Sequence, residues 1–158
     1  MLNNKKILIT GIANKFSIAN GIAQSMSKNG AELAFAYQNE RLLKKIKPIA
    51  DDLGVKTLIE CDVACDKSIE QTFSQLKDEW GTLDGIVHSI GFAPSDQLDG
   101  DFTEVTTREG FQIAHDISSY RFTALAKGAL PILSENAALL TLTYLGSIQS
   151  LPNYNVMG

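Results

Sequence analysis

Short β-rich runs alternate with stretches of helical periodicity along the chain. Five such runs, rich in branched and aromatic residues, recur at intervals of roughly 25 to 50 residues. They cover residues 7–10, 33–37, 55–61, 86–90 and 138–144. Most of them are nearly continuous apolar runs, which is typical of parallel strands covered on both faces. The alternation therefore predicts an α/β fold, a Rossmann-like doubly wound parallel sheet with right-handed crossovers.

Apolar residues at helical spacing mark the segments between these runs. The first three stripes are Ile18, Ile22 and Met26, then Leu42, Ile46, Ile49 and Leu53, then Ile69, Phe73, Leu76 and Trp80. A longer helical region begins at the capping-box pattern Thr106-x-x-Glu109 and closes at Pro131. The stripe of this region is Ile113, Ile117 and Tyr120. We expect each stripe to be the face with which one helix packs on the sheet.

Size and charge limit the classes of protein that the chain can represent. Its 158 residues match the roughly 100–200 residues of one domain, and no linker or repeat divides residues 1–158. The content of 44% apolar and 20% charged residues is that of a folded globular protein. The net charge of −4 and the lack of a basic block argue against a nucleic-acid partner. We therefore predict one folded domain over residues 1–158.

Targeting signals and cysteine usage indicate the compartment. No window approaches the ~18 consecutive apolar residues of a membrane span, and residues 1–10 lack the apolar stretch of a signal peptide. We expect a cytoplasmic protein with no membrane partner. Cys61 and Cys65 are the two cysteines, and a single C-x3-C pair offers too few ligands for zinc. We expect two unpaired thiols and no metal site.

A glycine turn follows the first β-rich run, in the pattern Gly11-x5-Ser17-x3-Gly21. In a dinucleotide-binding fold, the backbone N–H groups of this turn and the following helix N-terminus hold a pyrophosphate. The pattern is not G-x-G-x-x-G, so the glycines alone are a weak signal. Ser17 can donate to a phosphate, or it can serve as a helix cap alone.

Longer segments resemble the bacterial NADH-dependent enoyl-acyl carrier protein reductases, a divergent group of short-chain dehydrogenases/reductases. Besides the glycine turn, these segments are residues 30–35, 37–39, 61–63, 88–93, 114–120 and 152–158. The resemblance covers essentially the whole chain and corresponds to roughly the first three-fifths of the family enzyme. It implies reduction of trans-2-enoyl thioesters on acyl carrier protein in type II fatty acid synthesis, by a homotetramer. We expect the C-terminal strands of the sheet to be absent from this chain.

The resemblance also implies a set of NADH-binding residues. They are Gly11, Ser17, Ile18, Gln38, Asp62, Val63, Ser89, Ile90 and Gly91. Gln38 ends the second run, where it can hydrogen-bond a ribose hydroxyl without repelling a 2′-phosphate, and nearby Arg41 leaves NADPH open. The Asp62 carboxylate can accept from the adenine amino group, or Asp62 can be an ordinary turn residue. His88 is expected to pack and satisfy its ring within the core.

Two tyrosines near the end of the chain are the candidate catalytic groups. Hydride addition to an enoyl thioester leaves negative charge on the thioester oxygen, and a phenol can donate to it. By resemblance, Tyr154 is the principal donor and Tyr144 the second active-site tyrosine. The family lysine would stand at position 161, beyond this chain. Thr141 occupies the place of the serine found in 3-ketoacyl reductases, which remain an alternative together with a dinucleotide-binding module that has no catalytic activity.

Overall fold

The computed structural model describes residues 1–157, and within them five parallel strands form one sheet. The strands are β1 (Lys6–Ile9), β2 (Glu32–Tyr37), β3 (Thr57–Glu60), β4 (Leu83–His88) and β5 (Leu133–Thr141). Their order in the sheet is β3-β2-β1-β4-β5, so the direction of winding reverses between β1 and β4. The predicted α/β fold with a doubly wound parallel sheet is confirmed.

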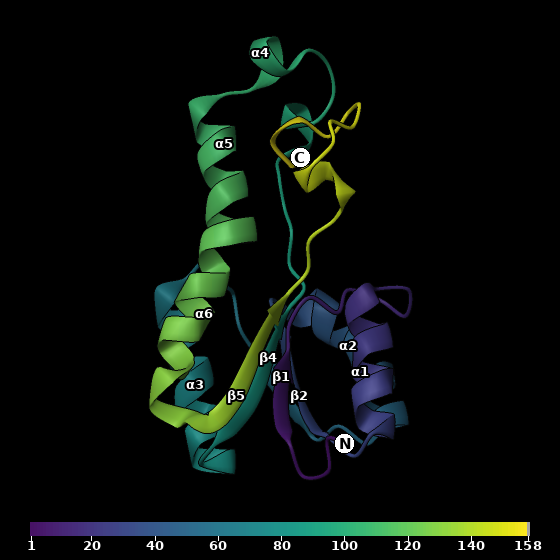
Figure 1. Cartoon of the computed structure of the whole chain (residues 1–158), viewed down its shortest axis with the longest axis vertical. Coiled ribbons are helices and arrows are strands. Elements are labelled where there is room, and N and C mark those ends of the chain that lie inside the picture. Colours follow the sequence, from purple (N-terminus) through teal and green to yellow (C-terminus); the bar gives the residue numbers. More distant parts are fainter. Residues whose placement is uncertain (158) are drawn as a thin grey trace.

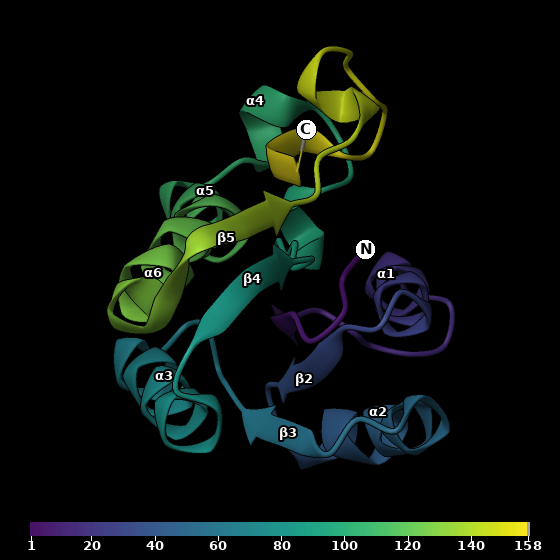
Figure 2. The same ribbon diagram turned by 60° about the horizontal axis from the view of Figure 1, so that its bottom comes forward.

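Helices cover both faces of this sheet (Figures 1 and 2). They are α1 (Ile18–Lys28), α2 (Glu40–Leu53), α3 (Asp66–Trp80), α4 (Phe102–Val105), α5 (Arg108–His115) and α6 (Arg121–Ala129). A π-helical turn (Asp116–Tyr120) joins α5 to α6, and short 3₁₀ turns occupy Ser95–Gln97, Leu130–Ile132, Leu145–Ser147 and Asn155–Met157. Figure 2 shows α1 and α2 on one face and α3, α5 and α6 on the other.

The core is divided into two layers by the period of the strands. In β1, Ile7 and Ile9 belong to the cluster that contains the buried residues of α1 and α2, whereas Leu8 belongs to the cluster with α3 and α6. Successive side chains of a strand point to opposite faces, so both faces of β1 must be apolar. This explains why the central runs are continuously apolar in the sequence.

The predicted packing stripes are correct for α3 and, apart from their first residues Ile18 and Leu42, for α1 and α2. All four stripe residues of α3 are buried. In α1 the buried apolar residues are Ala19 and Ala23, while Ile22 and Met26 lie at the edge of the cluster and Ile18 is 70% exposed. Alanines let the helix approach the sheet closely, and Ile18, in the first turn of α1, precedes this packing face.

The region between α4 and β5 differs from its prediction in three ways. The N-cap of α5 is Thr107, whose Oγ1 accepts from the N–H of Gly110 at 3.0 Å, one residue later than the predicted capping box. The π-helical turn adds a residue to the helical repeat, so Tyr120 is 50% exposed and Arg121 takes the buried position. The last strand begins at Leu133, earlier than predicted, since pairing with β4 overrides its polar composition.

The structure also bears on membrane-spanning segments and on the two cysteines. Among residues 1–157, no helix has the length and apolar character needed to cross a bilayer. Both cysteines are free thiols, Cys61 buried and Cys65 exposed, as predicted. Burial raises the pKa of the Cys61 thiol and outweighs the opposite effect of a hydrogen bond with Thr72.

Candidate functional site

A cavity of about 420 Å³ opens at the carboxyl ends of four strands, where the strand order reverses. Its lining comes from residues 10–13 after β1, 36–38 around the end of β2, 61–64 after β3 and 89–92 after β4. Open α/β sheets bind ligands at this position, because diverging crossovers leave a crevice there. The volume lies within the range of about 300–1,000 Å³ that is usual for small-molecule sites.

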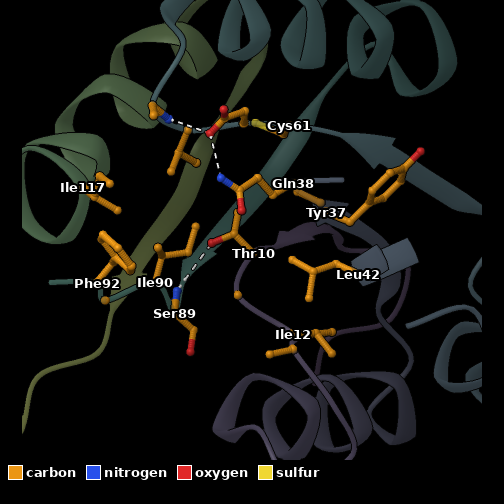
Figure 3. A pocket seen from close by; sticks show the side chains of 17 residues that line it. Thr10, Ile12, Tyr37, Gln38, Leu42, Cys61, Ser89, Ile90, Phe92 and Ile117 are labelled. Atoms are coloured by element: carbon orange, nitrogen blue, oxygen red, sulfur yellow. Dashed lines mark hydrogen bonds between the residues drawn. The ribbon is translucent and has the colours of Figure 1, made fainter. Parts of the chain in front are cut away.

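Apolar side chains form two opposite walls of this cavity. Figure 3 shows Ile90, Phe92 and Ile117 on one side and Tyr37 and Leu42 on the other. Ile117, a residue of the predicted packing stripe, packs against the core and also lines the cavity. Its second role had no separate signal in the sequence, because one apolar stripe serves both purposes.

Most of the predicted cofactor-binding residues gather at this cavity. Those that line it are Gly11, Gln38, Asp62, Val63, Ser89, Ile90 and Gly91. Ser17 and Ile18 are not part of the lining and lie at the N-terminus of α1. The predicted set therefore consists of a cavity group and a helix N-terminus, joined by the turn that follows β1.

The turn after β1 requires glycine at position 11. Gly11 has a φ of +84°, and a Cβ atom there would lie 1.9 Å from the backbone oxygen of Ser89. The close approach is therefore between the loops after β1 and β4, two neighbouring strands. Gly21 has no such requirement, because a Cβ atom at that position would meet nothing within 4 Å.

Ser17 stands at the N-cap of α1, but its side chain makes no capping hydrogen bond. Its Oγ instead accepts from the N–H groups of Ala13 at 3.0 Å and Asn14 at 3.1 Å. The side-chain cap considered from the sequence is thus not formed, and the hydroxyl keeps its own proton for donation. The N–H groups of Ile18 and Ala19 bond to no group within the described part of the chain. This helix end can hold an anion.

Gln38 and Asp62 are brought together across the ends of β2 and β3. The Gln38 Nε2 donates to the Asp62 Oδ1 at 3.3 Å, and the same oxygen accepts from the N–H of Ala64 at 3.1 Å. The Ser68 Oγ accepts from the Asp62 N–H at 3.0 Å. Asp62 is therefore both a turn residue and a cavity residue, and the two readings of the sequence are compatible.

The segment after β4 is held by hydroxyl groups. Thr10 Oγ1 donates to the carbonyl of Val87 at 3.1 Å and accepts from the N–H of Ser89 at 3.4 Å. Ser118 Oγ accepts from the Phe92 N–H at 2.9 Å and donates to the Phe92 carbonyl at 3.0 Å. These bonds fix the backbone path on both sides of the predicted cofactor residues 89–91.

Tyr144 and Tyr154 lie beside each other beyond the carboxyl ends of the strands. Their ring centroids are 5.3 Å apart with a tilt of 58°, and the residues are 39% and 40% exposed. The Tyr144 hydroxyl donates to the carbonyl of Met157 at 2.7 Å. Partial burial raises the pKa of Tyr144, and Tyr154 acts in the same direction. Tyr144 is therefore a neutral phenol near pH 7.

The tyrosine pair is outside the cavity lining but connected to its rim. A Cβ atom on Gly91, a lining residue, would lie 3.3 Å from the Cε of Met157, whose carbonyl accepts from Tyr144. Asn155 Nδ2 donates to the Gly100 carbonyl at 3.3 Å, which joins this segment to the loop after β4. In Figure 1 the segment after β5 lies near that loop.

His88 packs in the core as predicted, at 1% exposure. Its Nδ1 lies 3.1 Å from the Thr141 Oγ1, and its ring is tilted against Phe122 with centroids 5.6 Å apart. The prediction of a satisfied ring is wrong for Nε2, which has no hydrogen-bond partner within residues 1–157. Burial lowers the pKa of His88, so the imidazole is neutral near pH 7.

Known proteins share this sequence and this fold. Residues 11–158 match the family model described as enoyl-(acyl carrier protein) reductase. The Escherichia coli enoyl-[acyl-carrier-protein] reductase [NADH] is 56% identical over 157 residues, which cover 99% of this chain and 60% of that protein. The Aquifex aeolicus enoyl-[acyl-carrier-protein] reductase (NADH) structure matches with a TM-score of 0.96 at 45% identity, covering 99% of this chain and 62% of the other.

A second solved structure is the Anaplasma phagocytophilum enoyl-(acyl-carrier-protein) reductase in complex with NAD. It matches with a TM-score of 0.95 at 39% identity, covering 99% of this chain and 60% of the other. The chain thus spans 60–62% of the length of these relatives. The match to the family model extends over nearly the whole sequence and agrees with the fold. The chain therefore belongs to the enoyl-(acyl carrier protein) reductase family.

Proposed function

We propose that this protein is an NADH-dependent enoyl-acyl carrier protein reductase of type II fatty acid synthesis. It reduces the C2–C3 double bond of trans-2-enoyl thioesters. The observation that carries the proposal is the pair of neighbouring phenols, Tyr144 and Tyr154, connected to the rim of a cavity at the strand-order reversal. A dinucleotide site and a proton donor for an enolate are the two components that this reaction requires.

The residues present fit a dinucleotide. The Ser17 hydroxyl, which donates to no group within residues 1–157, and the N–H groups of Ile18 and Ala19 would hold the pyrophosphate. Asp62 Oδ2 makes no hydrogen bond within residues 1–157, so the carboxylate keeps acceptor capacity for an adenine amino group. Gln38, beside Asp62, would face the adenosine ribose. When bound, NADH supplies the hydride.

NADH is favoured over NADPH by the groups around Gln38. Arg41, the residue that left NADPH open, is exposed on α2 and is not part of the cavity lining. If Gln38 held the adenosine ribose, a 2′-phosphate there would meet a side chain that is hydrogen-bonded to the Asp62 carboxylate. The negative charges of the phosphate and the carboxylate repel each other, so Asp62 disfavours the phosphorylated cofactor.

The two tyrosines take different roles. Addition of hydride to the β-carbon places negative charge on the thioester oxygen, and a donor aimed at that oxygen lowers the barrier. The Tyr154 hydroxyl makes no hydrogen bond within residues 1–157, so its proton is free for this purpose. Tyr144 already donates to Met157 and orients the Tyr154 ring by contact. Tyr154 is thus the principal donor and Tyr144 a positioning residue.

The substrate partner, assembly and location follow from the family resemblance. The substrate is an enoyl group on acyl carrier protein, the enzyme is a homotetramer, and it works in the cytoplasm. Residues 1–158 act as its dinucleotide-binding domain. Light scattering of the purified protein tests the tetramer, and a monomeric mass under assay conditions would contradict it.

The function is tested with protein expressed from the full coding sequence. The assay follows NADH oxidation with crotonyl thioester, and a parallel reaction contains acetoacetyl thioester. We expect turnover of the enoyl substrate. Faster turnover of the 3-ketoacyl substrate would favour the related reductases instead, and NADH binding without turnover of either substrate would indicate a binding module.

A further inference from the structure

Arg121, at the first residue of α6, has a buried side chain that joins three separate segments. Its Nε and Nη2 donate to Asp116 Oδ2 at 3.1 and 2.7 Å. Its Nη1 donates to Asp66 Oδ1, and its Nη2 also donates to the carbonyl of Ala64 at 3.2 Å. The side chain itself is only 9% exposed. The guanidinium therefore has partners in the loop after β3, at the first residue of α3 and in the π-helical turn.

These partners lead directly to two walls of the cavity. Ala64 lines the cavity, and its N–H donates to the Asp62 Oδ1 that also accepts from Gln38. Asp116 directly precedes Ile117, which lines the cavity from the π-helical turn. One guanidinium thus fixes the backbone behind Asp62 and the start of the turn that carries Ile117.

The arrangement needs the geometry of arginine. A planar guanidinium can serve two carboxylates and a carbonyl at once, whereas a lysine ammonium is a compact charge without that fork. The carboxylates of Asp66 and Asp116 are 76% and 42% exposed, so water can solvate them if the guanidinium is removed. Loss of Arg121 therefore leaves no buried unpaired charge, and its main consequence is loss of order in the loop.

We propose that Arg121 is a positioning residue for the cofactor site, which holds the adenosine end of the cavity in its binding geometry. The proposal rests on the proposed function, because it assigns Asp62 and Gln38 to the adenosine of NADH. Arg121 does not touch the expected position of the reacting atoms, so it acts through Ala64 and Asp62. It should influence cofactor affinity rather than the chemical step.

The test compares Arg121→Met and Arg121→Lys with the wild type, all from the full coding sequence. Methionine replaces the unbranched aliphatic part of the arginine side chain and removes every hydrogen bond of the guanidinium. We expect Arg121→Met to raise the Kd of NADH by about five- to tenfold, the effect of losing roughly one supporting hydrogen bond. AMP, which is the adenosine half of the cofactor, should lose affinity by a similar factor. The KM for NADH should rise while kcat changes little, and Arg121→Lys should recover part of the affinity.

Hydrogen exchange of the ligand-free protein measures the positioning itself. The N–H groups of Asp62, Ala64 and Cys65 are hydrogen-bonded in the loop, so exchange over residues 61–66 should be faster in Arg121→Met. Asp84→Asn is the matched control. Asp84 accepts from Lys5 and the Lys6 N–H at the amino ends of the strands, so its loss should affect stability without changing exchange in this loop.

The outcomes separate the two proposals. Unchanged exchange over residues 61–66 in Arg121→Met would overturn the positioning role. Faster exchange with an unchanged NADH Kd would also overturn it, since Arg121 would then be structural only. If the wild type fails to bind NADH, the proposed function is wrong, and exchange still decides whether Arg121 orders the loop.

Discussion

Gly11→Ala places a methyl group where the backbone of Ser89 already lies. The new Cβ would be 1.9 Å from the Ser89 oxygen and 2.5 Å from its carbonyl carbon, both of them backbone atoms. The loops after β1 and β4 must therefore separate by roughly 1.5–2 Å to reach ordinary contact. The φ of +84° adds strain for any residue with a side chain.

The structure allows an order-of-magnitude value for this change. A left-handed conformation costs about 1–2 kcal/mol for a residue with a Cβ, and overpacking costs typically about 1–3 kcal/mol. We expect the free energy of unfolding to fall by about 2–5 kcal/mol. Because Gly11 and Ser89 both line the cavity, NADH affinity should also fall severely.

Gly21→Ala is the matched control within the same motif. Gly21 lies inside α1, and a Cβ there would meet no atom within 4 Å. Alanine is a better helix former than glycine, so this variant should gain about 0.5–1 kcal/mol. Urea unfolding measures both stabilities, and fluorescence titration measures NADH binding below the unfolding midpoint. Wild-type stability and NADH affinity in Gly11→Ala would refute the close contact between the two loops.

Further predictions concern the tyrosines, a carboxylate at the opposite end of the sheet, and a helix cap. Tyr154→Phe should reduce turnover of a crotonyl thioester by an amount equivalent to about 3–4 kcal/mol, while NADH binding persists. Tyr144→Phe should reduce turnover less. Equal turnover in Tyr154→Phe and wild type, with an unchanged circular dichroism spectrum, would contradict the donor role. Burial alone would raise the pKa of Asp84, but hydrogen bonds from Lys5, the Lys6 N–H and Ser134 outweigh it and lower that pKa. The stabilisation by Asp84 is therefore complete above its unfolded pKa of about 3.9 and is lost as the pH falls through its lower folded pKa. Asp84→Asn should cost about 1–2 kcal/mol at pH 7, and urea titrations should show the difference shrinking at acid pH; a difference that does not depend on pH would contradict this. Thr107→Ala should lower the free energy of unfolding by about 1 kcal/mol, because the helix cap is lost. Thr106→Ala should be neutral or stabilising, because the buried Oγ1 of Thr106 has no partner among residues 1–157. Thermal melts measure both variants, and a lower melting temperature for Thr106→Ala than for Thr107→Ala would show that Thr106 is the cap.

Local patterns in the sequence were sufficient to predict the sheet and the helices between its strands. Continuous apolar runs indicated strands buried on both faces, and the structure has Ile9 on one side of β1 and Leu8 on the other. The four stripe residues of α3 were recognisable because they repeat within one helix. Such patterns depend on the period of a single element, so they can be detected without knowing its neighbours.

Contacts between distant segments were decided by the tertiary structure. The requirement for glycine at position 11 comes from Ser89, which is far away in the sequence but follows the neighbouring strand. The π-helical turn exposes Tyr120 and buries Arg121, reversing what a regular helical repeat predicts. No single-element pattern signals the partners of Arg121, because they belong to the loop after β3, to the start of α3 and to the π-helical turn.

The candidate site shows the same division between local and tertiary information. The sequence by itself identified Gln38 and Asp62 as residues that end neighbouring runs, and Tyr144 and Tyr154 as a pair by family resemblance. The hydrogen bond between Gln38 and Asp62 and the 5.3 Å separation of the tyrosine rings appeared only in the structure. Parallel strands bring their carboxyl ends to one edge of the sheet, but side-chain rotamers and loop closure set the distances there, and these depend on packing against residues far along the chain.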